Sequence, residues 1–115
     1  MGAAGSQDAE EFRAARLSIS ADRYPGEAIT LVLEGELDIS TCPAVVDRIE
    51  AWRGTEPELR LDLSRITFID SQGLHLLLEV TAPAADGAAP VVLVKPSQTV
   101  LQVVTVTGTT ARLGL

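Results

Sequence analysis

The sequence predicts a single α/β domain in which helices flank a mixed central β-sheet, with the element order ββαβαβα. The chain has 115 residues, close to the commonest size of one domain. Stretches with alternating apolar residues are separated by stretches in which apolar residues recur at helical spacing. Strands that alternate with helices indicate parallel strands joined by crossover helices. Two adjacent strands at the start add an antiparallel hairpin, so the sheet is expected to be mixed.

The N-terminal part of the chain predicts a flexible lead-in followed by this hairpin. Residues 1–12 are small, polar and acidic, which is typical of a segment without fixed structure, and the domain is expected over 13–115. Apolar residues alternate in 15–19 and again in 29–33, the pattern of two half-buried strands. Between them Pro25-Gly26 indicates a turn.

A helix is expected directly after the hairpin. Val45, Ile49 and Trp52 recur at i, i+4 and i+7, so they share one face of a helix. Residues typical of helix ends flank this face: Ser40 or Thr41 and then Pro43 before it, and Gly54 after it.

The second half of the chain repeats the alternation of strand and helix. Alternating leucines begin at Leu59 and run into an apolar stretch that ends at Ile69, which predicts a strand with a turn at Asp62-Leu63-Ser64. The next helix is expected to bury Leu74, Leu77 and Leu78. The continuous apolar run VVLVK is typical of a strand buried on both faces.

The C-terminal segment fits two kinds of structure. Val100, Leu101 and Val104 permit a helix capped by Ser97, whereas the β-branched run VVTVT has strand propensity. Local pattern and propensity therefore leave helix and strand open for this segment.

Composition and charge exclude several classes of partner. A net charge of −7 argues against nucleic acid and against an anionic membrane surface, both of which attract Lys and Arg. No apolar run reaches the roughly 18 residues of a membrane helix, and no signal peptide is visible. The single cysteine, Cys42, excludes an internal disulfide, so we expect a cytoplasmic protein. No cofactor is expected, and no metal, because His75 and Cys42 have no partners at ligand spacing.

The junction FIDSQGL carries the chemistry of most interest. Asp70 and Ser71 end an inner strand and open a helix, at the edge of an α/β sheet where functional groups gather. The first amides of a helix are unpaired and carry partial positive charge, so Asp or Ser there serves as a cap. Gly73 costs the helix about 1 kcal/mol relative to Ala, which suggests close approach by another backbone or by a partner.

Two further interpretations of Ser71 go beyond a helix cap. As a serine hydrolase, Ser71 would use His75 as its base at i+4, but the sequence lacks G-x-S-x-G and a group that orients the histidine. As a phosphorylation site, Ser71 would gain about −1.5 to −2 charges. Two unit charges about 5 Å apart, at an effective dielectric near 20, interact by roughly 3 kcal/mol, on the order of a hundredfold in affinity. One phosphoryl group would therefore switch off a docking surface without changing the fold.

Three stretches of the chain resemble the STAS domain family, specifically its stand-alone anti-sigma factor antagonists. They are GELDISTCPAV at 35–45, LRLDLSRITFIDSQGLHLLL at 59–78, and VVLVKPS at 91–97. The pattern D-L-S followed by I-D-S-x-G-L is specific to this resemblance, which covers nearly the whole chain after residue 15. The tail from Val104 is similar to the last helix of the family, which favours helix there.

The resemblance implies a non-enzymatic partner switch. The unphosphorylated antagonist would bind an anti-sigma factor that is also a serine kinase of the GHKL type, and a sigma factor would be released. The kinase would phosphorylate Ser71, which weakens binding, and a PP2C-type phosphatase would reverse this. The residues expected to contact the kinase are Asp38, Thr41, Asp70, Ser71, Gln72 and Gly73. Ser64 of D-L-S is expected to form a turn rather than a second phosphorylation site.

Other members of the family leave one alternative open. STAS domains also occur in scaffolds, transporter tails and lipid-transport accessory proteins, and the short chain without a membrane segment argues against a transporter. A scaffold subunit would bind other STAS domains in a larger signalling assembly, and its size in solution would depend on concentration.

Overall fold

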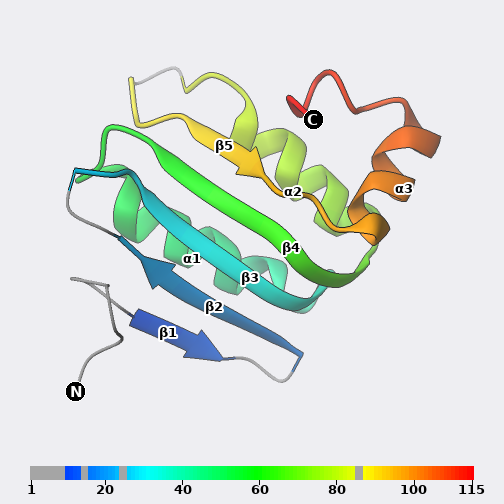
Figure 1. Cartoon of the computed structure of the whole chain (residues 1–115), viewed down its shortest axis with the longest axis horizontal. Helices are drawn as coiled ribbons and strands as arrows, with labels where there is room; N and C mark the ends of the chain where they lie inside the picture. Colours follow the sequence, from blue (N-terminus) through cyan, green and yellow to red (C-terminus); the bar gives the residue numbers. More distant parts are fainter. Residues whose placement is uncertain (1–9, 14–15, 24–25, 85–86) are drawn as a thin grey trace.

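A five-stranded mixed sheet, with helices covering one of its faces, forms the centre of the structure (Figure 1). The computed structural model describes residues 10–13, 16–23, 26–84 and 87–115. The elements are β1 (Glu10–Arg13), β2 (Leu17–Asp22), β3 (Ile29–Leu37), α1 (Cys42–Arg53), β4 (Leu59–Ile69), α2 (Ser71–Thr81), β5 (Val91–Val94) and α3 (Gln98–Thr107).

The predicted order ββαβαβα is confirmed from β2 to α3. The strand β1 was not predicted: it pairs antiparallel with β2 at the edge of the sheet and begins within the predicted lead-in. Its sequence, EEFR, is mostly charged, as edge strands often are, and for that reason lacks an alternating apolar pattern. Residues 1–9, and with them most of the lead-in, lie outside the described residues, as do Ala15 and Pro25.

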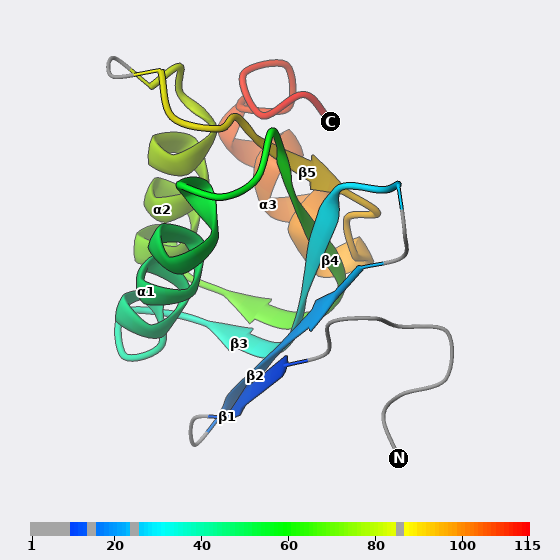
Figure 2. The same cartoon turned by 90° about the vertical axis from the view of Figure 1, so that its left-hand side faces the viewer.

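The strand order β1-β2-β3-β4-β5 places α1 and α2 on the same face of the sheet. Strands β2 and β3 form the predicted antiparallel hairpin, whereas β3, β4 and β5 are parallel. Each parallel connection crosses over in the same right-handed sense while the strands advance in one direction, so both crossover helices cover one face. Figure 2 shows α1 and α2 side by side on that face.

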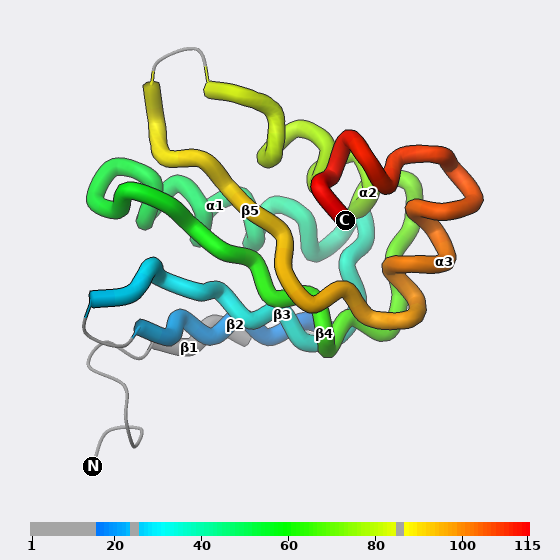
Figure 3. The backbone as a smooth tube through the Cα atoms, turned by 45° about the horizontal axis from the view of Figure 1, so that its top comes forward, coloured from blue at the N-terminus to red at the C-terminus, as the bar shows by residue number. Residues whose placement is uncertain are grey.

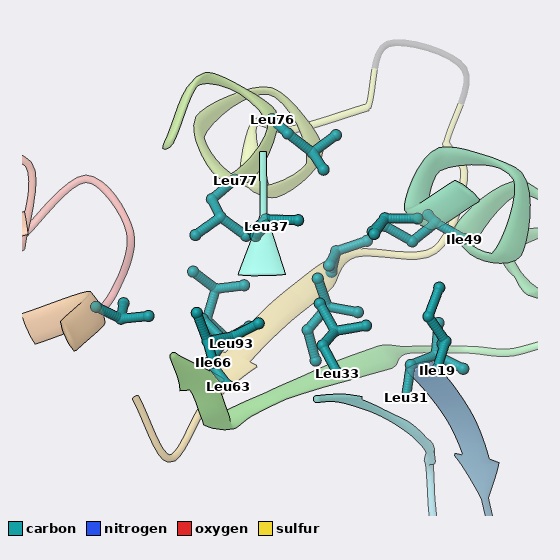
Figure 4. Packing of buried hydrophobic residues seen from close by; sticks show 14 of the residues in the cluster. Ile19, Leu31, Leu33, Leu37, Ile49, Leu63, Ile66, Leu76, Leu77 and Leu93 are labelled. Carbon is teal, nitrogen blue, oxygen red and sulfur yellow. The ribbon is translucent and has the colours of Figure 1, made fainter. Parts of the chain in front are cut away.

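The core lies between the sheet and these two helices. Inward-facing residues of β2 and β3 alternate with outward ones as predicted, and Leu31 and Leu33 are completely buried. In α1 the predicted residues Val45 and Ile49 are buried. Figure 4 shows Leu37, at the end of β3, close to Leu77 of α2. Full burial of each such side chain contributes about 1.5–3 kcal/mol relative to exposure.

Two details of the buried faces differ from expectation. In α2 the buried residues are Gly73, Leu76 and Leu77, so the inner face is rotated away from Leu74 and Leu78, which are half-buried. In β5 burial alternates, and Val92 is 39% exposed, because helices cover only one face of the sheet. The expectation of a strand buried on both faces was wrong for β5.

Strand β4 runs without a break through Asp62-Leu63-Ser64, where a turn was predicted. Asp62 pairs with Val32 and Arg65 with Glu34, so β4 carries one extra residue and forms a β-bulge. The Ser64 backbone N–H and hydroxyl both donate to Asp62 Oδ1, at 2.9 and 2.6 Å, and hold this bulge. The sequence motif D-L-S therefore bends a continuous strand rather than ending it.

The C-terminal segment is a helix, which settles the conflict between pattern and propensity. Ser97 Oγ accepts from the Val100 N–H at 3.2 Å, and Gly108 ends the helix in the left-handed conformation at φ 70°. Val100 and Val104 are completely buried, so tertiary packing outweighs the β-branched composition. Figure 3 shows the chain leaving β5 and entering α3 at one end of the sheet, where the Ser97 N–H donates to the Leu63 carbonyl.

No helix in the described part of the chain combines the length and apolar character needed to span a bilayer.

Candidate functional site

The ends of β3 and β4 bring two helix starts together. Leu37 and Ile69 are partners in the parallel pairing of these strands, and each is the last residue of its strand. The segments that follow, beginning at Asp38 and at Asp70, therefore lie side by side at the carboxyl edge of the sheet. This is the edge at which α/β proteins commonly place functional groups.

Asp70 caps α2, so the hydroxyl of Ser71 is not needed as a cap. Its backbone is extended, and its Oδ1 accepts from the Gly73 N–H at 2.9 Å. Ser71 is the first residue of the helix and is exposed. Among the residues that the structure describes, no hydrogen bond engages the Ser71 hydroxyl. The sequence allowed either residue to cap the helix; in the structure Asp70 is the cap, and Ser71 is an exposed residue at the start of the helix.

Gly73 is buried, and its role is close packing against β3. A Cβ placed on it would lie 2.5 Å from the Leu37 carbonyl oxygen and 2.9 Å from Ile69 Cγ1. The close approach that the sequence suggested is therefore made by another backbone of the same chain. Gly73 was expected to face a partner together with Gln72, but only Gln72 is exposed.

Asp38 and Thr41 build the turn that leads into α1, and both are buried, at 5% and 3% exposure. Asp38 Oδ1 accepts from the Ser40 N–H at 2.9 Å and the Ser40 hydroxyl at 2.7 Å. Thr41 Oγ1 accepts from the Asp38 N–H at 2.9 Å and donates to the Glu36 carbonyl at 2.8 Å. Thr41 holds the first position before α1 but does not cap it. The turn uses the polar atoms of both side chains, and contact of Asp38 and Thr41 with a partner stays a prediction.

The charge of Asp38 is stabilised within this turn. The hydrogen bond from the Ser40 side chain, followed by those from the Ser40 and Thr41 backbones, lowers the pKa of Asp38 below 3.8 in spite of its burial. Arg16 Nη2 adds an ion pair to Asp38 Oδ2 at 2.8 Å and also donates to Ser40 Oγ. Asp38 is therefore a charged anchor that ties the start of β2 to the start of α1.

The second carboxylate oxygen of Asp70 joins the two helix starts. Asp70 Oδ2 accepts from the Ile39 N–H at 3.3 Å, and the Asp70 N–H donates to the Leu37 carbonyl at 3.3 Å. One side chain thus holds both the first turn of α2, through Gly73, and the loop before α1. Any group attached to Ser71 would stand beside this shared carboxylate.

A shallow hollow opens next to Ser71 between α1 and α2. It has a volume of about 270 Å³ and is lined by Ile39, Cys42, Pro43, Val46, Gln72, His75, Leu76 and Glu79. We call it the α1–α2 groove. Ile39 is 69% exposed and Val46 is 37% exposed, so part of the groove's rim is apolar. Its outer wall carries His75 and Glu79, whose side chains lie 3.3 Å apart at i, i+4.

The exposed apolar residues of this groove were not among the expected site residues. Ile39 stands between Asp38 and Ser40, in a turn rather than on the face of a strand or helix. An apolar residue between two turn-forming polar residues is the sequence signal that could have identified Ile39, because such a residue has no core face to occupy.

Cys42 is one of the residues that line the groove, and it carries a protonated thiol. Its Sγ donates to the Gln72 carbonyl at 3.6 Å. Burial, together with the nearby carboxylates of Asp70 and Asp38, raises the pKa of Cys42 to about 11. A thiol with so high a pKa is a poor nucleophile at neutral pH, so Cys42 serves packing.

The arrangement of Ser71 and His75 does not form a catalytic pair. His75 Nε2 lies beside Glu79, and no hydrogen bond joins His75 to Ser71 within the described ranges. In those ranges, no group of three or more His, Cys, Asp or Glu side chains is placed to hold a metal ion.

Comparison with solved structures shows the same fold in anti-sigma factor antagonists. The antagonist SpoIIAA in its unphosphorylated form is 24% identical, with 78% of this chain and 80% of that chain covered and a TM-score of 0.61. An anti-sigma factor antagonist from Mycobacterium paratuberculosis is 24% identical, covering 87% and 86%, with a TM-score of 0.64. The Bacillus cell fate determinant SpoIIAA in its phosphorylated form is 24% identical, covering 78% and 83%, with a TM-score of 0.58.

Sequence comparison identifies the family. None of the curated proteins matches the chain. A family model described as "Mlab, STAS domain" matches residues 20–114, which run from within β2 to the residue before last and include both helix starts. The chain belongs to the STAS domain family.

Proposed function

We propose that this protein is a cytoplasmic, non-enzymatic anti-sigma factor antagonist. In its unphosphorylated form it binds an anti-sigma serine kinase of the GHKL type, and a sigma factor is freed. Phosphorylation of Ser71 by that kinase ends the interaction, and a PP2C-type phosphatase restores it. Family membership and the likeness in fold to anti-sigma factor antagonists support this proposal.

The proposal rests on Ser71, an exposed residue whose hydroxyl makes no hydrogen bond to the part of the chain that the structure describes. A kinase must reach the acceptor oxygen, and Ser71 stands at the first position of α2 with its cap supplied by Asp70. The helix start tolerates an added anion because its amides carry partial positive charge. The phosphoryl group is therefore expected to leave the fold intact.

The surface that binds the kinase is the α1–α2 groove together with Ser71 and Gln72. Ile39 and Val46 supply exposed apolar area beside the acceptor, the kind of patch that marks an interaction site. Asp38, Thr41 and Gly73 support this surface from beneath, because they shape the two helix starts without being exposed. A phosphate at Ser71 would place about −1.5 to −2 charges at the edge of an apolar contact, next to Asp70.

Affinity capture from the native lysate tests the proposal. Wild type, Ser71→Glu and Ala51→Glu serve as parallel baits; Ala51 is exposed on α1, does not line the groove, and provides the charge control. A GHKL-type kinase is expected on wild type and on Ala51→Glu, and is expected to be lost on Ser71→Glu. If all three baits return the same partners, or only other STAS proteins, the partner switch is wrong and the scaffold alternative takes its place.

Binding measurements with the captured kinase then show whether a group at Ser71 weakens the complex through its charge or through its size. Glu and Gln have the same size, so Ser71→Glu and Ser71→Gln differ only in charge. If charge is decisive, Ser71→Glu weakens binding on the order of a hundredfold while Ser71→Gln retains it, and added salt partly restores the Ser71→Glu complex. Equal losses in both variants would show that the phosphate acts by steric block.

A further inference from the structure

One carboxylate connects the acceptor serine with the apolar part of the groove's rim. Asp70 Oδ1 accepts from the Gly73 N–H at 2.9 Å and so caps α2, the helix that Ser71 begins. Asp70 Oδ2 accepts from the Ile39 N–H at 3.3 Å, in the loop before α1. The two oxygens of a single side chain therefore hold the acceptor serine and the exposed Ile39 in a fixed relation.

Ile39 has few other contacts that fix its position. Its backbone N–H donates to Asp70 and, within the described residues, to no other group. Its side chain is 69% exposed, so few atoms pack against it. By contrast, its neighbours Asp38 and Ser40 are bonded to each other through the Ser40 N–H and the Ser40 hydroxyl. The place of Ile39 at the rim therefore depends on the carboxylate of Asp70.

We propose that Asp70 is a positioning residue for the kinase-binding surface, and that a phosphoryl group on Ser71 acts through it by turning its carboxylate away from the Ile39 N–H. This role rests on the proposed partner switch and describes how the switch reaches the groove. In the unphosphorylated protein Asp70 holds Ile39 where the kinase meets it. In the phosphorylated protein Ile39 is released, so the surface changes in shape as well as in charge.

The carboxylate of Asp70 is the first charged group that the phosphoryl group affects. Consecutive Cα atoms lie about 3.8 Å apart, so a phosphoryl group on Ser71 stays near this carboxylate, within the Debye length of about 10 Å at 0.1 M salt. It brings about −1.5 to −2 charges to a place that is already negative. Its oxygens also find donors at the start of α2, because the Ser71 and Gln72 N–H groups have no acceptor in the described chain.

Of the two contacts that Asp70 makes, the one to Ile39 is expected to break. At 3.3 Å it is longer than the 2.9 Å bond to the Gly73 N–H, and hydrogen bonds weaken with length. The Gly73 N–H also lies at a helix start, whose partial positive charge holds the carboxylate. Repulsion by the phosphoryl group is therefore relieved at least cost if Oδ2 leaves Ile39 while Oδ1 keeps its place on α2.

The variant Asp70→Asn separates these two contacts. Asn caps helices as well as Asp does, so its Oδ1 can keep the Gly73 N–H, whereas its NH₂ group cannot accept from Ile39. Asp47→Asn is the matched control, since it makes the same change at an exposed position of α1 that does not line the groove. Wild type and the full chain with phosphoserine incorporated at position 71 during synthesis complete the set, and none of the four proteins requires the kinase.

Amide hydrogen exchange followed by NMR measures the state of Ile39 in these four proteins. The Ile39 amide is expected to exchange roughly tenfold faster in Asp70→Asn and in the phosphoserine protein than in wild type, because a hydrogen bond to a charged group is lost. The Gly73 amide in Asp70→Asn, and both amides in Asp47→Asn, should exchange as in wild type. The proposal is overturned if the Ile39 amide keeps its wild-type rate in Asp70→Asn or in the phosphoserine protein, or if Asp47→Asn accelerates it equally.

Binding of the captured kinase provides a second readout. Asp70→Asn removes a negative charge, yet it should weaken binding by about five- to tenfold. Ile39→Ala should then weaken binding less in Asp70→Asn than in wild type, because the two residues act as a unit. Additive losses would show that Asp70 does not act through Ile39.

The coupling and the partner switch can fail separately. If Ser71→Glu loses the kinase while the Ile39 amide exchanges alike in all four proteins, the partner switch stands and the coupling is wrong. If the Ile39 amide responds as expected but no bait captures a kinase, the coupling within the chain exists and the partner switch is wrong.

Discussion

The segments that follow β3 and β4 each begin with an aspartate and then a hydroxyl residue, but these residues have different roles in the two places. At the start of α1, Asp38 and Thr41 are buried, and their polar atoms are bonded to one another, to Ser40 and to Glu36. At the start of α2, both carboxylate oxygens of Asp70 likewise accept hydrogen bonds. Ser71, by contrast, is exposed, and its hydroxyl makes no hydrogen bond within the described residues. An acid followed by a hydroxyl therefore marks a turn in one place and an accessible acceptor in the other. The difference is that the hydrogen bonds of the first turn engage the hydroxyl of Thr41, whereas those of the second engage Asp70 and not the hydroxyl of Ser71.

The largest expected effect tests the packing that fixes the second helix start. Gly73→Ala should lower the free energy of unfolding by about 3 kcal/mol, the upper end of overpacking costs, because the new methyl group meets the Leu37 carbonyl. The helix propensity gained, about 1 kcal/mol, does not offset this. Urea denaturation measures the change.

Gly54→Ala is the control for this variant. Gly54 ends α1 with φ −80°, and no atom lies within 4 Å of an added Cβ. The control should be neutral or stabilising by about 0.4–1 kcal/mol. Equal effects of the two substitutions would show that α2 does not press on β3 as described.

A smaller effect separates the two hydroxyls. Thr41→Val keeps the side-chain shape but leaves the buried Asp38 N–H without its acceptor, so it should cost about 1–2 kcal/mol in unfolding free energy. Ser71→Ala removes an exposed hydroxyl and should change stability by less than about 0.5 kcal/mol. Thermal or urea unfolding of both variants measures these two changes in the free energy of unfolding. A stability loss in Ser71→Ala as large as that in Thr41→Val would make Ser71 a structural residue.

A further effect, which depends on pH, concerns the charge of Asp38. Because the folded state lowers the pKa of Asp38 below 3.8, its carboxylate stabilises the protein above that pH, and this contribution is lost as pH falls through the folded pKa. Asp38→Asn should therefore lower stability at neutral pH and flatten the loss of stability below about pH 4. Unfolding free energies measured at a series of pH values would show this. Parallel curves for wild type and Asp38→Asn would mean that the Ser40 and Arg16 contacts do not hold the charge.

The spacing of apolar residues along the sequence predicted the architecture, because the residues that recur with the period of a strand or a helix are the ones that the structure buries. The alternation in β2 and β3 and the spacing of Val45 and Ile49 correspond to side chains that face the core. It failed where another rule outweighed it. The edge strand β1 is mostly charged and therefore shows no apolar alternation. The bulge in β4 depends on a hydrogen bond from Ser64 to Asp62, which the spacing of apolar residues cannot reveal. In α3 the apolar spacing permitted the helix that the structure shows, and the burial of Val100 and Val104 outweighs the strand propensity that had left the choice open.

The candidate site was predictable in place but not in detail. Asp70 and Ser71 stand at the helix start that the sequence indicated, and the close approach inferred from Gly73 is real. Burial of Asp38 and Thr41 could not be read from residue type, because the polar atoms that make a turn are the same ones that bind a partner. Exposure of Ile39 and Val46 depends on how α1 and α2 meet, which is a property of the tertiary structure.

The protonated thiol of Cys42 makes this protein a convenient subject for chemical labelling. With a pKa of about 11, only on the order of one Cys42 side chain in ten thousand is a thiolate at pH 7, and thiolate is the form that reacts with maleimides and oxidants. A cysteine introduced at an exposed position would therefore react far faster than Cys42. Fluorescent probes can therefore be attached at a cysteine introduced on α3, away from the α1–α2 groove, while Cys42 stays largely unmodified.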